Sequence, residues 1–129
     1  MTSIRVLVVD DFEPLRKAIR LILAARPELE VIGEASDGPE AVQKAVELKP
    51  HLILLDLGLP TMNGIEVARR FRELVPESRI ILFTQDSSVD FVEEARCMGA
   101  SGYVVKAKAG SQLLAAVDAV LSGKQSFAS

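Results

Sequence analysis

The sequence contains no tryptophan, few aromatic residues of any kind (5%) and a single cysteine, Cys97. A single cysteine excludes an internal disulfide and is typical of a reducing compartment. No apolar run approaches the roughly 20 residues that a membrane-spanning helix requires, and the amino terminus shows no signal-peptide pattern. We therefore expect a cytoplasmic protein without a membrane partner, whose core is built from aliphatic side chains.

Positive charge is also scarce. Fifteen Lys and Arg residues stand against 18 Asp and Glu, which gives a net charge of -3, and the basic residues form no block. Because proteins bind nucleic acids by neutralising phosphates with Lys and Arg, we expect no nucleic-acid binding by this chain alone. The length of 129 residues and the hydrophobic content of 49% fit one globular domain.

Short apolar segments alternate with amphipathic ones along the chain. The spacing of hydrophobic residues predicts strands at 4–9, 30–35, 52–55, 79–83 and 102–105. It predicts helices over 13–26, between Asp37 and Pro50, from Ile65 to the residue before Pro76, around Val89 to Ala95 and around Leu113 to Leu121. Asp37 is expected to cap the second helix, and Gly99 the fourth.

Continuously apolar strands separated by helices indicate an α/β protein with a parallel sheet that is covered on both faces. The strand–helix units are too few for a closed eight-stranded barrel. We therefore expect an open, doubly wound five-stranded sheet of the flavodoxin-like kind, with strand order 2-1-3-4-5 and five helices. The domain is expected to span residues 1–123, with 124–129 as a polar tail or the start of a linker.

Residues with reactive side chains follow the predicted strands. Asp10 and Asp11 end the first strand, Asp56 the third, Thr84 the fourth and Lys106 the fifth. In an open parallel sheet, ligands bind beyond the carboxyl ends of the strands, near the switch in strand order. We therefore expect the three carboxylates, the hydroxyl group and the ammonium group to converge in one pocket.

Such a group of carboxylates predicts a metal-assisted reaction. Carboxylates packed together repel one another, and Mg²⁺ suits a site with few carboxylates, several waters and a phosphate. A carboxylate beside this cation can attack phosphorus and form an aspartyl phosphate. The ammonium group of Lys106 and the hydroxyl group of Thr84 would then stabilise the oxygens of the transferred phosphoryl group.

Four segments carry a family resemblance. They match the receiver-domain motifs of two-component response regulators in order and spacing, over essentially the whole chain: Val6–Asp11, Leu54–Pro60 with Asn63 and Gly64, Phe83–Thr84, and Gly102–Lys106. The resemblance implies that Asp56 accepts a phosphoryl group from a sensor histidine kinase or a phosphotransfer protein. It also implies that Thr84 and Lys106 contact the phosphoryl oxygens.

The same resemblance implies a set of metal ligands and a switch. Mg²⁺ is expected on Asp11, Asp56 and the backbone carbonyl of Gly58, with Asp10 acting through water. Tyr103 has two interpretations. It is either a core aromatic residue or a switch residue, whose ring changes rotamer together with the side chain of Thr84. A second copy of the chain is a candidate partner after phosphorylation.

A subfamily is also indicated. Gly33–Gly38 and Ala109–Leu114 resemble receivers that usually precede a helix-turn-helix DNA-binding domain, which favours the regulatory part of a transcription regulator. Two positions depart from the family pattern. Ala107 stands where many members have a proline after a cis peptide bond, so the geometry of the Lys106–Ala107 bond is open, and Gln85 stands where many have a small residue.

Other functions are less well supported. Phosphohydrolases of the haloacid-dehalogenase type have a second Asp two residues after the nucleophile, and Gly58 occupies that place here. A pseudo-receiver that only binds a partner would not need the complete set of site residues. Neither glycine-rich nucleotide-binding motif occurs. We therefore expect a switch that catalyses only its own phosphorylation and dephosphorylation, with His51 as a turn residue and Cys97 as an unreactive one.

Overall fold

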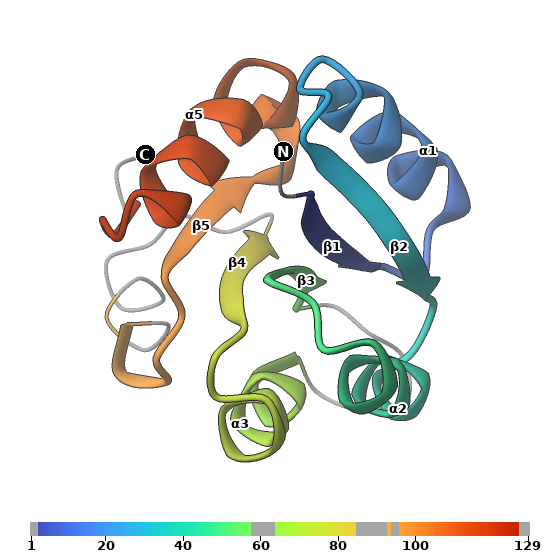
Figure 1. The fold of residues 1–129 in the computed structure, drawn as a ribbon, viewed down its shortest axis with the longest axis vertical. Helices are drawn as coiled ribbons and strands as arrows, with labels where there is room; N and C mark the ends of the chain where they lie inside the picture. The colour runs from blue at the N-terminus through green and yellow to red at the C-terminus, as the bar shows by residue number, and fades with distance from the viewer. Residues whose placement is uncertain (1–2, 58–63, 85–92, 94–95, 127–129) are drawn as a thin grey trace.

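A parallel sheet with the strand order β2-β1-β3-β4-β5 forms the centre of the molecule (Figure 1). The computed structural model describes residues 3–57, 64–84, 93 and 96–126. The strands are β1 (Ile4–Val9), β2 (Leu29–Ala35), β3 (Leu52–Asp56), β4 (Arg79–Thr84) and β5 (Gly102–Val105). All neighbouring strands pair in parallel. The predicted α/β fold and its strand order are confirmed.

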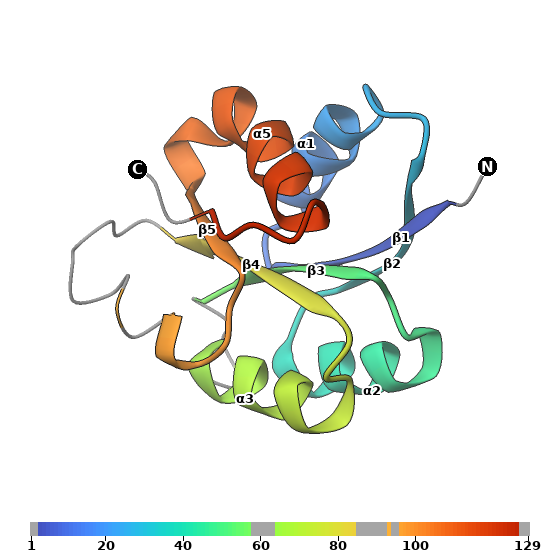
Figure 2. The same cartoon turned by 60° about the vertical axis from the view of Figure 1, so that its left-hand side comes forward.

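Helices cover both faces of the sheet. They are α1 (Glu13–Leu23), α2 (Gly38–Leu48), α3 (Gly64–Leu74) and α5 (Ala109–Leu121), together with the short 3₁₀ helix η1 (Lys106–Lys108). Figure 2 shows α1 and α5 on one face and α2 and α3 on the other. Val89, Val92 and Ala95, from which a fourth helix was expected, lie outside the described residues. No helix in the described ranges is both long enough and apolar enough to cross a bilayer.

The core has two parts, because neighbouring residues of each strand point to opposite faces of the sheet. In β1, Leu7 and Val9 join the cluster under α2 and α3, whereas Val6 and Val8 join the cluster under α1 and α5. All of β3 is buried. The largest of the fully buried side chains are leucines and isoleucines, together with Phe71 and Phe83. This packing fixes the strand ends on which the site is built.

The helix ends follow the sequence signals in part. The Asp37 carboxylate accepts a hydrogen bond of 2.9 Å from the backbone N–H of Glu40, as predicted for a helix cap. Gly99 has a positive φ of 86°, the conformation expected of a residue that ends a helix. The first helix ends at Leu23, before the predicted Arg26, and η1 was not predicted.

The chain turns back after α5 and runs beside β5. Gly123, with a positive φ of 86°, makes the turn. Ser126 then forms a bridge with Gly102: its N–H donates to the carbonyl of Ser101 at 2.9 Å, and its carbonyl accepts from the N–H of Tyr103 at 3.0 Å. Ser126 therefore pairs with part of the outer edge of β5. The boundary at residue 123 remains a prediction.

Candidate functional site

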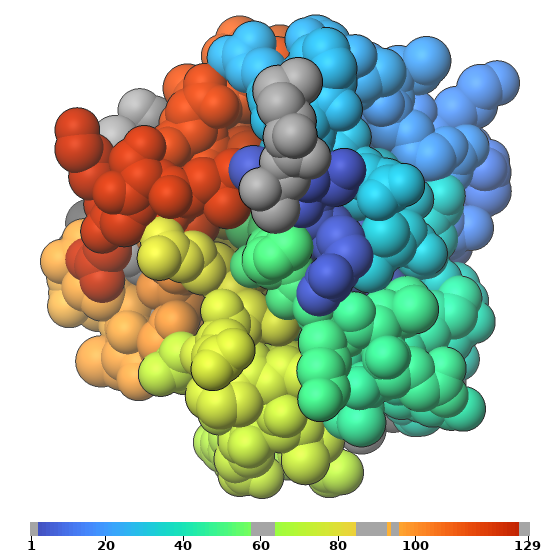
Figure 3. All heavy atoms as spheres, viewed as in Figure 1, coloured from blue at the N-terminus to red at the C-terminus, as the bar shows by residue number. Residues whose placement is uncertain are grey.

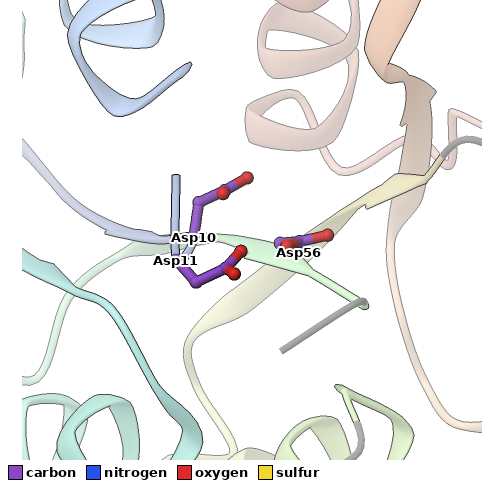
Figure 4. A group of neighbouring side chains, drawn as sticks. All are labelled: Asp10, Asp11 and Asp56. Carbon is purple, nitrogen blue, oxygen red and sulfur yellow. The ribbon is translucent and has the colours of Figure 1, made fainter. Parts of the chain in front are cut away.

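Three carboxylates meet at the carboxyl edge of the sheet. Asp10 and Asp11 follow β1, and Asp56 is the last residue of β3, the strand that pairs with β1 up to Val9 and Leu55. One carboxylate oxygen from each aspartate lies within 4.8 Å of the other two. In Figure 4, the side chains of Asp10 and Asp11 extend from the end of β1 toward the side of Asp56. The structure thus brings together the acidic residues selected from the sequence.

The surroundings of the three aspartates differ. Asp10 and Asp56 are 1% and 2% exposed, whereas Asp11 is exposed to solvent. Burial raises the pKa of Asp10, and the negative charges of Asp56 and Asp11 raise it further. A hydrogen bond of 2.8 Å from the N–H of Phe12 and the positive charge of Lys106 oppose this increase without cancelling it. The repulsion between these like charges therefore lowers the stability of the folded state.

Lys106 supplies the positive charge of the cluster. Its Nζ lies 2.8 Å from Oδ1 of Asp56 and 3.7 Å from Oδ2 of Asp10. Burial alone would lower the pKa of Lys106, but the hydrogen bond to Asp56 and the charges of the three aspartates outweigh burial and raise it. The ammonium group is therefore charged at neutral pH and points into the acidic pocket.

Thr84 lies on β4 and Tyr103 on β5, the two strands that follow β3 toward one edge of the sheet. Thr84 ends β4 and is buried, one residue beyond Phe83, which pairs with Asp56. Tyr103 is buried in the cluster under α2 and α3. This position agrees with the interpretation of Tyr103 as a core aromatic residue, and its role as a switch remains a prediction.

Other residues singled out from the sequence lie away from the cluster or outside the described residues. Gly58 and Gln85 are not among the described residues. The Lys106–Ala107 bond is trans. His51 accepts a hydrogen bond of 2.9 Å from the N–H of Arg5, just before β3 begins and so at the other end of the strand from Asp56. Figure 3 shows that part of the beginning of the chain (dark blue) is exposed on the viewed face. Cys97 is exposed.

Sequence reasoning missed Arg16. Its guanidinium group donates to the backbone carbonyl of Asp10 at 2.6 Å and to the carboxylate of Glu34 at 3.0 Å. In the sequence, Arg16 is one of several basic residues on the polar side of a helix. Glu34 lies on β2, 18 residues further along the chain, so no local signal in the sequence identifies this contact of Arg16.

The pocket fits a small divalent cation that prefers oxygen ligands. Three carboxylates against one ammonium group leave an excess of negative charge. Oδ2 of Asp10 is buried and, among the described residues, has no hydrogen-bond partner. A buried carboxylate oxygen without a hydrogen bond is costly unless a cation or water contacts it. The donor set of carboxylates at this spacing is the kind that hard cations use.

Comparison with known proteins gives consistent matches. Residues 6–118 match the family model described as the response regulator receiver domain. The transcriptional regulatory protein LiaR of Bacillus subtilis is 39% identical over 94% of this chain, and the DNA-binding transcriptional activator DevR/DosR of Mycobacterium tuberculosis is 38% identical over 94%. The chain covers 57% and 56% of these two proteins, so it spans little more than half of their length.

A solved structure also matches closely. The crystal structure of a LuxR-family two-component response regulator from Aurantimonas has a TM-score of 0.91 and 34% identity, with coverage of 97% of this chain and 89% of that chain. The relatives carry the names of transcription regulators, which confirms the subfamily indicated by the segments Gly33–Gly38 and Ala109–Leu114.

Proposed function

The chain belongs to the response regulator receiver domain family, and we propose that it is the phosphoacceptor switch of a two-component system, with Asp56 as the residue that accepts the phosphoryl group. The observation that carries the proposal is the position of Asp56. It ends a buried central strand, its Oδ1 lies 2.8 Å from the ammonium group of Lys106, and its carboxylate belongs to the three-aspartate cluster.

The proposed reaction is the transfer of a phosphoryl group from a histidine of a sensor kinase or a phosphotransfer protein. A carboxylate oxygen of Asp56 attacks phosphorus, the bond between phosphorus and the donor nitrogen breaks, and the imidazole leaves with the electron pair of that bond. Lys106 reaches Asp56 from across β4 and would follow the negative charge onto the phosphoryl oxygens, with the hydroxyl group of Thr84 donating to another oxygen.

The residues that would hold Mg²⁺ are Asp11 and Asp56 directly, Asp10 through water, and the carbonyl of Gly58, which lies outside the described residues. The bound cation would supply positive charge against the phosphoryl oxygens and the aspartates. Asp10 lies too deep to be a freely hydrated carboxylate, since it is 1% exposed. Its Oδ1 accepts from the N–H of Phe12, and Oδ2, which has no hydrogen-bond partner among the described residues, would face the cation and its waters.

The proposed output is a change of surface near β5. A hydroxyl group of Thr84 that moves toward a phosphoryl oxygen would leave space beside Tyr103, on the neighbouring strand. The phosphoryl group biases this equilibrium only through contacts that differ between the two states. A second copy of the chain is the proposed partner for the changed surface. The relatives' names support a role for the whole protein in transcription. The proposal that this chain makes no nucleic-acid contact itself rests on its net charge of -3.

A domain that catalyses only its own phosphorylation and dephosphorylation differs from an enzyme that turns over substrate. Incubation of the chain with acetyl phosphate, with and without Mg²⁺, followed by intact-mass measurement tests the proposal. We expect one phosphoryl group per chain in the presence of Mg²⁺ and almost none after chelation, with slow loss of the group once the donor is removed. Catalytic hydrolysis of the donor in excess of the protein, with no phosphorylated chain at any time, would contradict the proposal.

A further inference from the structure

The side chain of Arg16 joins the acidic turn, Asp10 and Asp11, to the end of β2. Arg16 lies near the start of α1, and its side chain is only 16% exposed. Its Nη1 donates to the backbone carbonyl of Asp10 at 2.6 Å, and its Nε donates to Oε1 of Glu34 at 3.0 Å. One planar guanidinium group therefore bridges two elements, a geometry that arginine supports and lysine does not.

Glu34 is itself held in place. Nη1 of Arg20 donates to both of its carboxylate oxygens at 2.7 Å, and the ammonium group of Lys44 donates to its backbone carbonyl. Figure 1 shows α1 alongside β2, so these contacts run directly between neighbouring elements. Arg16 is thus anchored to a fixed carboxylate by a charge-assisted hydrogen bond, which is about twice as strong as a neutral one.

The other side of Asp10 is tied to the same strand. The N–H of Asp10 donates to the carbonyl of Ala35 at 3.0 Å. With Arg16 on its carbonyl, both backbone polar groups of Asp10 are therefore fixed relative to the end of β2. The carbonyl of Asp10 belongs to the planar peptide unit that leads to Asp11. Holding this oxygen sets the plane of that peptide unit and, with it, the point from which the side chain of Asp11 begins.

Asp11 depends on this backbone support because its side chain has no place in the core. It is exposed, whereas Asp10 and Asp56 are buried. We propose that Arg16 is a positioning residue of the metal site, which places the carboxylate of Asp11 by holding the Asp10–Asp11 peptide unit. This inference rests on the proposed function, since it assumes that Asp11 binds Mg²⁺. Arg16 contacts the backbone of Asp10 and does not act on the phosphoryl group.

The test is a Mg²⁺ titration of the full chain, in which binding is monitored through the backbone amide NMR signals of the acidic turn. Loss of groups that support metal ligands typically weakens metal binding 10- to 100-fold, so we expect about tenfold weaker binding for Arg16→Ala. Arg16→Lys keeps the charge and one partner, and should fall between wild type and Arg16→Ala. Arg20→Ala is the matched control, because it removes a guanidinium group from the same carboxylate of Glu34 but leaves the hydrogen bonds of Arg16 to Asp10 and Glu34, and that of Lys44 to the backbone of Glu34, in place. It should bind Mg²⁺ within about threefold of wild type, because a partly exposed ion pair contributes little.

A second readout does not depend on metal. In the metal-free protein, amide hydrogen exchange at Asp11 and Phe12 should be faster in Arg16→Ala than in wild type and unchanged in Arg20→Ala. Wild-type Mg²⁺ affinity and exchange in both Arg16 variants would overturn the role of Arg16, as would an equal loss in Arg20→Ala. If Arg16→Ala does not fold, Arg16→Lys gives the same decision.

Failure of the inference and failure of the proposed function remain distinguishable. A wild-type chain that binds Mg²⁺ and is phosphorylated, together with unchanged Arg16 variants, contradicts only the inference. A wild-type chain that binds no Mg²⁺ at its acidic turn contradicts both.

Discussion

Lys106 and Asp56 form an ion pair of 2.8 Å. Asp56 ends β3 and Lys106 directly follows β5, and β4 lies between these two strands. The long side chain of Lys106 crosses the end of β4 to reach the carboxylate. This pair balances part of the charge of the acidic cluster. It also places an ammonium group beside the carboxylate that is proposed to accept the phosphoryl group, so the same lysine would contact the phosphoryl oxygens after transfer.

Loss of the ammonium group should destabilise the metal-free protein. In Lys106→Ala, three aspartates remain without their nearby cation, and we expect the free energy of unfolding to fall by about 1–2 kcal/mol, less than for a fully buried pair because Lys106 is partly exposed. Urea unfolding in the presence of a chelator measures this change. Lys108→Ala, which removes a neighbouring exposed lysine, is the control and should stay within about 0.5 kcal/mol of wild type. Equal effects of the two substitutions would contradict the account.

Neutralising Asp10 should stabilise the metal-free protein. Because the pKa of Asp10 is raised in the folded state, its negative charge costs stability above that pKa, and the cost disappears as pH falls through it. Asp10→Asn keeps an oxygen that can accept from the N–H of Phe12 and should raise the free energy of unfolding at neutral pH. Thermal unfolding at a series of pH values measures the gain, which should shrink toward acid pH. A gain that grows as pH falls would refute this assignment.

Asp11 should be needed for metal binding but not for folding. Asp11 is exposed and would bind the cation directly, so its replacement by Ala should weaken Mg²⁺ binding at least about tenfold. Its effect on the unfolding temperature should be small. The control is Glu13→Ala, an acidic residue near the same turn that pairs with Arg20 at 3.5 Å instead of joining the cluster. Calorimetric titration of both variants decides, and unchanged affinity in Asp11→Ala would place the metal elsewhere.

Gly102 should be required for the pairing of Ser126 with β5. A Cβ atom at residue 102 would lie 2.7 Å from the carbonyl oxygen of Ser126, which is too close. Gly102→Ala should therefore displace Ser126, break its two hydrogen bonds and destabilise the protein by about 1–2 kcal/mol. Gly110→Ala in α5, where a Cβ would meet nothing within 4 Å, should instead be neutral or stabilising by about 0.5–1 kcal/mol. Denaturant unfolding separates the two, and a neutral Gly102→Ala would show that the pairing contributes nothing.

The fold was predictable because buried parallel strands leave a simple pattern. Segments such as Leu52–Leu55 are apolar at every position, and only a sheet covered on both faces buries them completely. The candidate site followed from the same pattern, since the carboxyl ends of neighbouring strands must meet. Asp10, Asp56 and Lys106 could therefore be grouped before their distances were known.

The contacts that depend on strand register and on chain reversal were not predictable. Arg16 meets Glu34 only because α1 packs beside β2, and the irregularity in the pairing of β1 with β2 between Val6 and Leu7 places Glu34 opposite Val8. Ser126 lies beside Gly102 only because Gly123 turns the chain back along β5. Neither contact has a local pattern in hydrophobicity or charge. Both require the three-dimensional arrangement of elements that are far apart in the sequence.

The most direct measurement is the location of the phosphoryl group. The chain is treated with acetyl phosphate and Mg²⁺, reduced with borohydride to trap any acyl phosphate, digested and analysed by mass spectrometry. The account predicts that the modification lies on Asp56, that Asp56→Asn abolishes it, and that Asp118→Asn, an aspartate that pairs with Arg26 on the surface, leaves it unchanged. Full modification of the Asp56→Asn protein at a residue outside the acidic cluster would contradict the central claim.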